Sequence, residues 1–561
     1  MSTASRAMEP HAFSPLRNRL FAALFIATSV SNLGTWMQDV GRAWLMTELT
    51  PSATLVALVQ GAAMAAMVLL VLPAGVVADL YDRRRILLLS QLWMLVVSAI
   101  LGITTILGIV TPSALLALTF ALAAGASFSM PAFQAMIADI VGEDDLTQAL
   151  VLNGVSVNLA RAVGPAVGGL LVAALGSGAV FLLNAASFAG VIAVLIFYRR
   201  EPNSSNWTAP DTAQLGRERA IDALRAGLRY AGNAPNFRSL LGRIAIFSLP
   251  AGALWSLLPL IARRDPNAGP ETYGLLLAAI GAGSVLTGLG LPYLRKMLSD
   301  NQIVTFAGIV LGASLAITAF ASFIAVPAML LAGTGWMAAM ALMMAGVQVA
   351  VPGWVRGRAT ALFLMIFAFG MTVGSVLWGM LADRFDVTVA LALACAVLVL
   401  GSAYSAAWPM PKAKDPSATA VTAAWPAPKL KDDIAPSDGP IFVTVEYRVR
   451  PEKTEDFKRL MCRIARTRRA SGTLSWNLFE HGNEPGHFVE TNLVATWDDH
   501  LRQRKRQTKE SINLEQDLRS TLQTDTEPQV THWLGSDRQL RTAEKDSEQL
   551  ITGQATIQAL T

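Results

Sequence analysis

The chain has 561 residues, of which 53% are hydrophobic and only 15% are charged, and its mean hydropathy is +0.44. A soluble protein has no use for so much apolar side chain, whereas each helical crossing of a bilayer needs about 20 consecutive apolar residues. The composition therefore indicates a membrane protein with several spans, and the small net charge of +5 argues against nucleic-acid binding. The two cysteines, Cys395 and Cys462, lie in dissimilar segments and no zinc spacing is found, so we predict no disulfide, metal site or cofactor.

Twelve apolar segments are long enough to cross a membrane as helices. Six lie within residues 1–198 and six within 240–407, which predicts an all-α membrane protein built from two six-helix halves. The predicted spans cover residues 20–46, 54–78, 86–109, 114–138, 149–175, 179–198, 240–261, 273–294, 303–325, 328–350, 359–381 and 387–407.

Basic residues are distributed unequally between the two sides of these spans. One side receives many more of them than the other, and cytoplasmic loops carry the Lys/Arg excess. Both termini are therefore predicted to lie in the cytoplasm. The richer side contains Arg17, Arg19, Arg83 to Arg85, Arg199, Arg200, Arg225, Arg229, Arg295, Lys296, Arg356 and Arg358, and the poorer side Arg263, Arg264 and Arg384.

Three polar segments complete the chain. Residues 199–239 contain an amphipathic, arginine-rich stretch, which is expected to lie on the inner membrane surface as a bridge between the halves. Residues 408–439 are rich in Pro and Ala and read as a linker. Residues 440–540 have the pattern β-α-β-β-α-β, which predicts a small cytoplasmic ferredoxin-like α+β domain, and 541–561 are expected to be a flexible tail.

Polar residues recur at helical spacing inside several spans and share one face of each helix. Lipid cannot satisfy such a stripe, so these residues are expected to line a cavity that holds water or substrate. Methionine and tryptophan stripes would add an adaptable wall suited to organic molecules. The candidate cavity residues are Asn32, Asp39, Arg42, Gln60, Gln134, Asn158, Arg161, Trp336 and Met340.

Each candidate also has a purely structural interpretation. Asp39 and Arg42 could form only an ion pair one turn apart, and the methionine and tryptophan stripes could serve helix packing. Arg161 lies too deep in its span to reach the interface easily, so we expect it to hold an anionic substrate or to keep Asp39 ionised. Asp39 is also the leading candidate for carrying a proton, because no histidine lies in any predicted span.

The stretch RAVGPAVGG, residues 161–169, combines a charge with helix-weakening residues. Gly164, Gly168 and Gly169 allow another helix to approach closely. Pro165 bends the helix where neighbours supply hydrogen-bond partners, which makes a pivot for alternating access.

Two of these motifs carry a resemblance to a known family. The loop GVVADLYDRRR resembles the major facilitator superfamily signature, with Gly75, Asp79, Arg83 and Arg84 matching, and GPAVGG resembles that superfamily's antiporter signature. The runs TWMQDVGRAWLMTELTPSATLVALVQGA and VRGRA are similar to its enterobactin-exporter-like, transmembrane secretion effector branch. The resemblance implies a multi-pass bacterial inner-membrane exporter of a small organic molecule, driven by proton exchange.

The signature loop also suggests a gate. Asp79 is expected to face the start of the eleventh span, where Arg356, Arg358 and the helix dipole would stabilise its carboxylate and close the cytoplasmic side. A second match, GMLADRF at residues 379–385, falls on the outer side, so we interpret Asp383 and Arg384 as a surface pair.

The C-terminal domain leaves alternatives open. It is similar to the extra domain of some members of that branch and resembles monooxygenase-like dimers, and it contains Trp476, His481, His487, Trp497 and His500. No nucleophile or metal constellation accompanies these residues, so we expect dimerisation or regulation rather than catalysis. The chain is therefore predicted not to be an enzyme. A non-transporting scaffold is the remaining alternative, which the polar stripes inside the spans disfavour.

Overall fold

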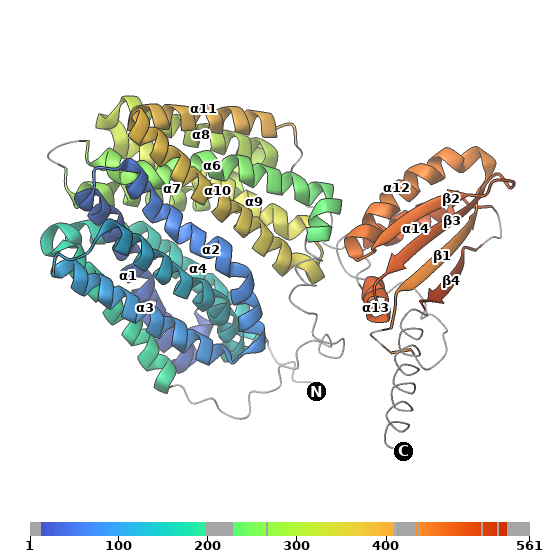
Figure 1. Ribbon diagram of the computed structural model, residues 1–561, viewed down its shortest axis with the longest axis horizontal. Coiled ribbons are helices and arrows are strands. Elements are labelled where there is room, and N and C mark those ends of the chain that lie inside the picture. The colour runs from blue at the N-terminus through green and yellow to red at the C-terminus, as the bar shows by residue number, and fades with distance from the viewer. Residues whose placement is uncertain are drawn as a thin grey trace, which may run out of the picture. The chain divides into compact units, whose positions relative to one another are not determined.

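The computed structural model describes residues 13–197, 228–264, 268–408, 410, 434–435, 438–505, 509–523 and 527–535. The described residues form two compact units, a bundle of long helices and a second unit that contains a four-stranded sheet (Figure 1). Most of the amphipathic bridge predicted at 199–239, most of the linker and the whole C-terminal tail lie outside the described residues.

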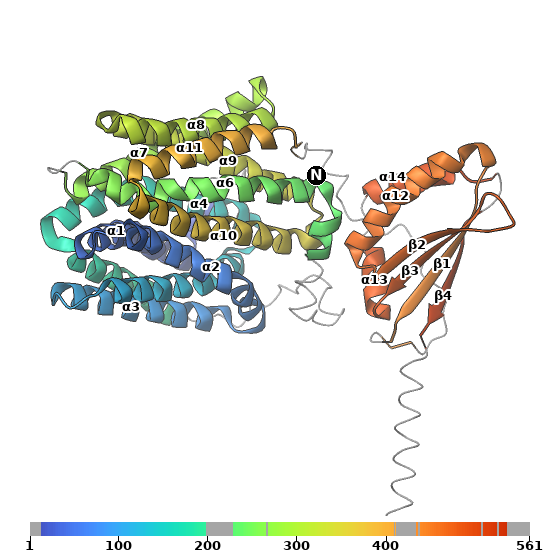
Figure 2. The ribbon, with the colours of Figure 1, turned by 45° about the horizontal axis from the view of Figure 1, so that its top comes forward.

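The bundle consists of long helices that run side by side in both views (Figures 1 and 2). Eleven helices of the described residues are long and apolar enough to cross a membrane. The bundle helices are α1 (Arg19–Leu49), α2 (Ala53–Leu80), α3 (Arg83–Ile106), α4 (Pro112–Phe197), α6 (Pro235–Ala262), α7 (Pro270–Met297), α8 (Asp300–Phe320), α9 (Ala325–Ala350), α10 (Arg356–Arg384) and α11 (Val387–Ser405).

Helix α4 is three helices in sequence, because Gly142 and Gly176 interrupt it with positive φ angles of 73° and 79°. Its apolar part Asp145–Phe197 has 53 residues, which at about 1.5 Å each would be about 80 Å long, more than twice the bilayer core. The left-handed conformation at Gly176, which glycine adopts without steric penalty, divides this stretch in two. The eleven helices therefore contain twelve crossing segments, as predicted.

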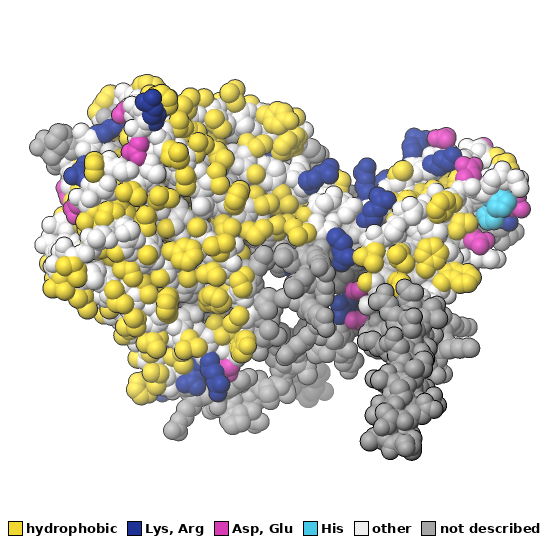
Figure 3. Space-filling view, in the orientation of Figure 1, with side chains coloured by type: hydrophobic (Ala, Val, Ile, Leu, Met, Phe, Trp, Pro, Cys, Tyr) yellow, Lys and Arg dark blue, Asp and Glu magenta, His cyan; other side chains and the backbone are white. Residues whose placement is uncertain are grey.

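The surface of the bundle is apolar over the face seen in Figure 3, and its charged side chains gather toward the ends. Large apolar side chains are exposed on many helices, among them Leu89 (67%), Leu170 (63%) and Leu289 (70%). An exposed apolar area of this extent is foreign to soluble monomers and matches a lipid environment.

The C-terminal sheet has the strand order β2-β3-β1-β4, with every pair antiparallel. This order is that of the predicted ferredoxin-like unit. One expectation is corrected: the second helix of the pattern is two helices, α13 and α14. The elements are β1 (Ile441–Arg448), α12 (Thr454–Ser471), β2 (Ser475–Glu480), β3 (His487–Val494), α13 (Trp497–Lys505), α14 (Lys509–Arg519) and β4 (Gln529–Leu534).

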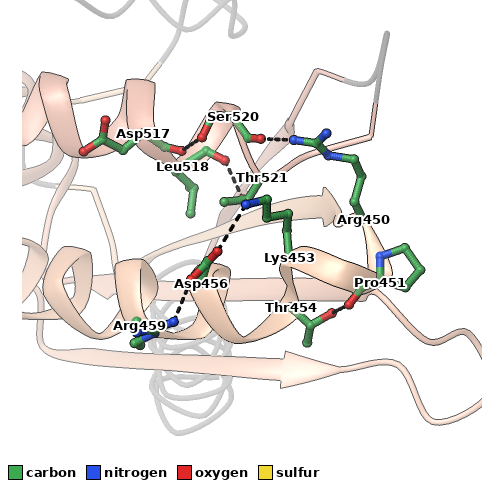
Figure 4. Close-up of polar contacts among 10 residues, drawn as sticks. All are labelled: Arg450, Pro451, Lys453, Thr454, Asp456, Arg459, Asp517, Leu518, Ser520 and Thr521. Carbon is green, nitrogen blue, oxygen red and sulfur yellow. Dashed lines mark hydrogen bonds and ion pairs between the residues drawn. The ribbon is translucent and has the colours of Figure 1, made fainter.

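One face of this sheet packs on its helices. Alternating residues of β1 are buried, including Val443, Val445 and Tyr447, and they contact Phe457 and Met461 of α12. Polar contacts fix the helix ends. The Arg450 guanidinium donates to the carbonyl oxygen of Ser520, and Asp456 pairs with Lys453 and Arg459 at 3.4 and 2.7 Å (Figure 4).

A buried carboxylate joins α12 to the same face of the sheet. Glu490 on β3 is 1% exposed and accepts hydrogen bonds from the Tyr447 hydroxyl at 2.7 Å, the Trp476 indole at 2.8 Å and Arg468 Nε at 3.3 Å. Arg468 also pairs with Glu515 of α14 at 3.3 Å. Burial and the Glu490 carboxylate raise the pKa of Tyr447 well above its usual value. A buried charge that keeps this many partners is stabilised in place.

Candidate functional site

A cavity lies where helices of the two halves meet. It is a small, partly open cavity of about 50 Å³, and four helices contribute to its wall. Three of the predicted cavity residues, Asp39, Arg42 and Gln60, line it. The remaining lining residues are Trp36 and Ala43 of α1, Val56 and Val59 of α2, Trp255, Ser256 and Pro259 of α6, and Tyr273 and Leu277 of α7.

The two charged residues of the cavity form an ion pair along α1. Arg42 Nη2 donates to Asp39 Oδ1, three residues away on the same helix. The ion-pair alternative is thus present in the structure, and both partners line the cavity as well. Arg42 Nε is buried and has no hydrogen-bond partner in the described part of the chain. Since an unpaired buried donor costs about 1–3 kcal/mol, a ligand that accepts its hydrogen bond would gain stability.

Aromatic side chains from the second half also line the cavity. Trp255 of α6 and Tyr273 of α7 line the cavity and were not predicted. The predicted Trp336 of α9 does not line it. This side chain is 9% exposed and packs behind Trp255, with ring centroids 5.2 Å apart. Met340 is also absent from the lining. The wall is therefore made by indole and phenol rings, which stack well on planar organic molecules.

Arg161 reaches the cavity through a neighbour. Its guanidinium carbon lies 5.4 Å from the centroid of the Trp36 ring, a cation–π contact, and Trp36 lines the cavity. Arg161 Nε is buried without a hydrogen-bond partner among the described residues. The ion pair of Asp39 is made with Arg42 rather than with Arg161, which corrects the predicted role of Arg161 in keeping Asp39 ionised.

The three remaining polar candidates are not in the cavity wall. Asn158 is exposed and donates from its amide to the carbonyl oxygen of Gly154 at 2.9 Å. Gln134 is exposed and Asn32 is half-buried. Asn158 lies one turn from Arg161 on the same face of α4.

Glycines bring the two halves into contact at one end of the bundle. A Cβ atom at Gly169 of α4 would lie 2.7 Å from the carbonyl oxygen of Pro270 and 3.1 Å from Cα of Gly274, both in α7. Further along α7, a Cβ at Gly281 would lie 2.6 Å from Cα of Ala162. We name this contact between α4 and α7 the glycine seam. The close approach predicted for this helix is therefore present.

Gly164 and Gly168 pack against a different helix, α1. A Cβ at Gly164 would lie 2.6 Å from Trp36 Cβ, and a Cβ at Gly168 would lie 2.8 Å from Met37 Cα. These two glycines seat α4 on α1 inside the first half and so place Trp36. Pro165 lies between them, and its carbonyl oxygen approaches Gly274 of α7 so closely that a Cβ there would lie 2.5 Å from it; the bend predicted at Pro165 stays a prediction.

A second connection between the halves joins α10 to the start of α2. One oxygen of the Asp383 carboxylate accepts from the backbone N–H of Ala53 at 2.6 Å, and the other accepts from the Ser52 hydroxyl at 2.8 Å and the Thr54 N–H at 2.9 Å. One turn earlier, a Cβ at Gly379 would lie 2.9 Å from Cα of Thr54. We name these contacts the Asp383 latch. Asp383 is exposed, as predicted, but its partners are these groups at the start of α2, and no ion pair with Arg384 is found among the described residues.

The predicted gate residues at the other end bond within the first half. Arg83 pairs with Asp139 of α4 at 2.8 Å, and Arg84 Nε donates to the carbonyl oxygen of Leu195 at 2.9 Å. A Cβ at Gly75 would meet no atom within 4 Å. The side chain of Asp79 lies outside the described residues, so its predicted contact with Arg356 and Arg358 stays a prediction.

Comparison with known proteins gives a consistent set of relatives. A family model described as transmembrane secretion effector matches residues 10–540. The multidrug efflux pump Tap of Mycolicibacterium fortuitum is 28% identical over 69% of this chain and 94% of its own length. The enterobactin exporter EntS of Shigella boydii serotype 4 is 27% identical over 68% of this chain and 90% of its own length.

Two further matches differ in what they cover. The MFS-type transporter YfiS of Bacillus subtilis is 25% identical over an aligned region that covers 47% of this chain and 61% of the length of YfiS. The solved structure of the nucleoside transporter NupG superposes with a TM-score of 0.55 at 15% identity, covering 69% of this chain and 98% of NupG. At this identity the superposition concerns the fold alone.

Proposed function

The chain belongs to the transmembrane secretion effector family of the major facilitator superfamily, and we propose that it exports small organic molecules from the cytoplasm by alternating access in exchange for protons. The observation that carries this proposal is the cavity between the two halves, which holds an ion pair and an aromatic wall. A scaffold would gain nothing from an unpaired buried donor such as Arg42 Nε.

The direction of opening follows from the two connections between the halves. The Asp383 latch and the contact of Gly169 with Pro270 both lie toward the end of the bundle that bears the loop 50–52 and the break at Gly176, and the glycine seam continues from there along α7 to Gly281. The excess of basic residues assigns this end to the outer side and the opposite end to the bacterial cytoplasm, with both termini. The structure would then correspond to a state that is closed to the outside.

The character of the cavity supports an amphiphilic organic substrate. Trp36, Trp255 and Tyr273 present aromatic surface, and Arg42 presents a buried donor beside the Asp39 carboxylate. Such a wall accepts planar molecules with polar substituents more readily than simple ions. The printed functions of the relatives, multidrug efflux and enterobactin export, fall in this class.

Proton exchange is assigned to Asp39. It is the carboxylate of the cavity wall, and its partner Arg42 lies on the same helix. A donor group on the substrate would bind the ionised Asp39 carboxylate, and protonation of Asp39 would release that group. Proton and substrate would then compete for one carboxylate, which is the linkage that an antiporter requires.

The proposed function is tested by accumulation assays in efflux-deficient cells, with a panel of dyes, drugs and catecholate siderophores. Wild-type protein should lower the accumulation of at least one compound, and a protonophore should abolish this effect. Asp39→Asn should lose the protonophore-sensitive part, and Arg161→Ala should lower export about 10-fold, because Trp36 loses its cation–π partner. Wild-type cells that accumulate every compound as the empty strain does would contradict the proposal.

A second proposal concerns the sheet domain, where no element of the described residues covers one face of the sheet. Phe442, Phe479 and Trp533 are 39%, 56% and 58% exposed, and Phe442 pairs with Trp533 across β1 and β4. We propose that this face joins two copies of the chain. The family match includes this domain up to residue 540, which favours a role within the transporter over a separate enzyme.

The mass of the detergent-solubilised full-length protein tests this dimer. Wild-type protein should be dimeric at micromolar concentration, and Phe442→Glu should be monomeric, because a charge on the uncovered face opposes its burial. Lys458→Glu on α12 is the matched control and should remain dimeric. A monomeric wild-type protein would eliminate the proposal.

A further inference from the structure

The hairpin between β2 and β3 brings two histidines together. The backbone N–H of His481 donates to the carbonyl oxygen of His487 at 2.8 Å, so the two residues face each other where the strands separate. Their imidazole rings stack with centroids 5.2 Å apart and an interplanar angle of 13°. Figure 3 shows histidine at the surface of the sheet domain beside acidic side chains.

A carboxylate from the tip of the same hairpin completes the cluster. Glu484 Oε2 lies 3.2 Å from His487 Nδ1, and one potential ligand atom from each of His481, Glu484 and His487 lies within 4.8 Å of the others. We propose that these three residues bind a divalent transition-metal ion of the zinc type, with water at the remaining coordination positions. Two imidazoles and one carboxylate form a familiar open zinc ligand set.

The backbone of the hairpin is fixed, which holds the ligands close before any metal binds. The backbone N–H of Val449, just after β1, donates to the carbonyl oxygen of Gly486 at 2.7 Å. Gly486 has a φ of 83°, and a Cβ there would lie 2.7 Å from the Val449 carbonyl oxygen. Only glycine fits this turn without strain. The hairpin tip is therefore pinned to β1, and little ordering remains to oppose metal binding.

The charges around the cluster favour a cation. Glu446 Oε2 lies 3.6 Å from His487 Nε2, and Arg448 Nη1 lies 2.6 Å from Glu484 Oε2. With neutral imidazoles, these two carboxylates and one guanidinium leave one negative charge. The hydrogen bond from Arg448 lowers the pKa of Glu484 and keeps it ionised. The other oxygen, Oε1, makes no hydrogen bond or ion pair within the described chain and can face a metal.

Small adjustments bring the ligands to coordination distance. The backbone N–H of Asn483 donates to His481 Nδ1 at 3.2 Å. If the metal binds Nδ1, it replaces this hydrogen bond. If the metal binds Nε2, the imidazole proton moves to Nδ1 and the hydrogen bond is lost. His487 Nε2 is buried without a hydrogen-bond partner among the described residues. Imidazole nitrogens select zinc, cobalt, nickel and copper, whereas magnesium and calcium prefer sites made of oxygen atoms.

The site is tested on the full-length protein, purified in detergent with a tag that contains no histidine and freed of metal with a chelator. Co²⁺ serves as the probe because its visible absorption reports imidazole ligation, and Zn²⁺ is then added as the competitor. Wild-type protein should bind about one Co²⁺ per chain and release it to Zn²⁺. His487→Ala should weaken binding by more than about 100-fold, since loss of a ligand exceeds the loss of a supporting contact.

Controls separate this site from other metal-binding groups in the chain. Glu484→Gln keeps the size of an exposed side chain, so it should weaken binding without disturbing the fold. His500→Ala and Cys462→Ser change two other donors in the same domain and should bind Co²⁺ as the wild type does. Unchanged Co²⁺ affinity in both His487→Ala and Glu484→Gln would overturn the proposal. Because binding is measured without transport, the result is independent of the proposed export.

Discussion

Replacing Asp383 with alanine should shift the protein about 100-fold toward conformations that are open at the end of the bundle bearing the loop 50–52. The carboxylate accepts backbone N–H groups of Ala53 and Thr54 from the other half, at 2.6 and 2.9 Å. It also accepts from the hydroxyls of Ser52 and Thr54. Because Asp383 is exposed, each of these four hydrogen bonds contributes only about 0.7 kcal/mol. Loss of all four, about 3 kcal/mol, is a change of about 100-fold in the equilibrium.

The shift is measured by labelling a cysteine from outside the cell with a membrane-impermeant thiol reagent. Leu277→Cys, on the cavity wall, carries the label in a background where Cys395 and Cys462 are replaced by serine. Asp383→Ala should accelerate labelling. Asp386→Ala is the control, because Asp386 caps α11 through the Thr388 N–H at 2.7 Å and bonds within its own half. Equal labelling rates in wild-type and Asp383→Ala protein would show that the latch does not hold this end closed.

Replacing Gly169 with leucine should reduce transport by at least about 100-fold while the protein still reaches the membrane. A Cβ at this position would already lie 2.7 Å from the backbone oxygen of Pro270, and the rest of a leucine side chain has no space between α4 and α7. The two helices must separate, so the closed state loses the packing of the glycine seam. Alternating access requires that state in every cycle.

Gly190→Leu is the matched control, since Gly190 lies in the segment of α4 that follows the break at Gly176, and a Cβ there would meet no atom within 4 Å. Export rates are compared at equal membrane abundance, using a compound found in the accumulation panel. If Gly169→Leu exports as fast as Gly190→Leu, the seam does not close in the transport cycle.

The sequence allowed the fold to be predicted in detail, because hydrophobic length and period are local properties. The break at Gly176 separates two apolar runs that were already distinguishable, and the strand pattern of the C-terminal domain dictates its sheet order. The polar stripe of α1 also identified Asp39 and Arg42 correctly as cavity-lining residues. A polar side chain inside an apolar span is stable only if it faces the interior of the bundle or a cavity.

What could not be predicted depends on which helices meet. The aromatic wall escaped notice because Trp255 and Tyr273 are amphipathic residues in apolar helices, and no period distinguishes a cavity face from a packing face. For the same reason, the sequence could not show that Trp336 packs behind Trp255 and does not line the cavity. The link from Asp383 to α2 could not be predicted, because its partners lie about 330 residues away in sequence, where no local pattern could reveal them.

The Asp383 latch has unequal sensitivity to mutation on its two sides. Two of its donors, at Ala53 and Thr54, are main-chain groups. The Thr54 hydroxyl also donates to Asp383, whereas Ala53 contributes its N–H alone and is buried. Small side chains at Ala53 should therefore leave the latch in place, while substitutions of Asp383 should break it. Proline is the exception among small residues, because it lacks the N–H and yet suits the first turn of a helix. A mutational scan in which Ala53→Pro alone among the small substitutions impairs function would be the genetic signature of a main-chain contact.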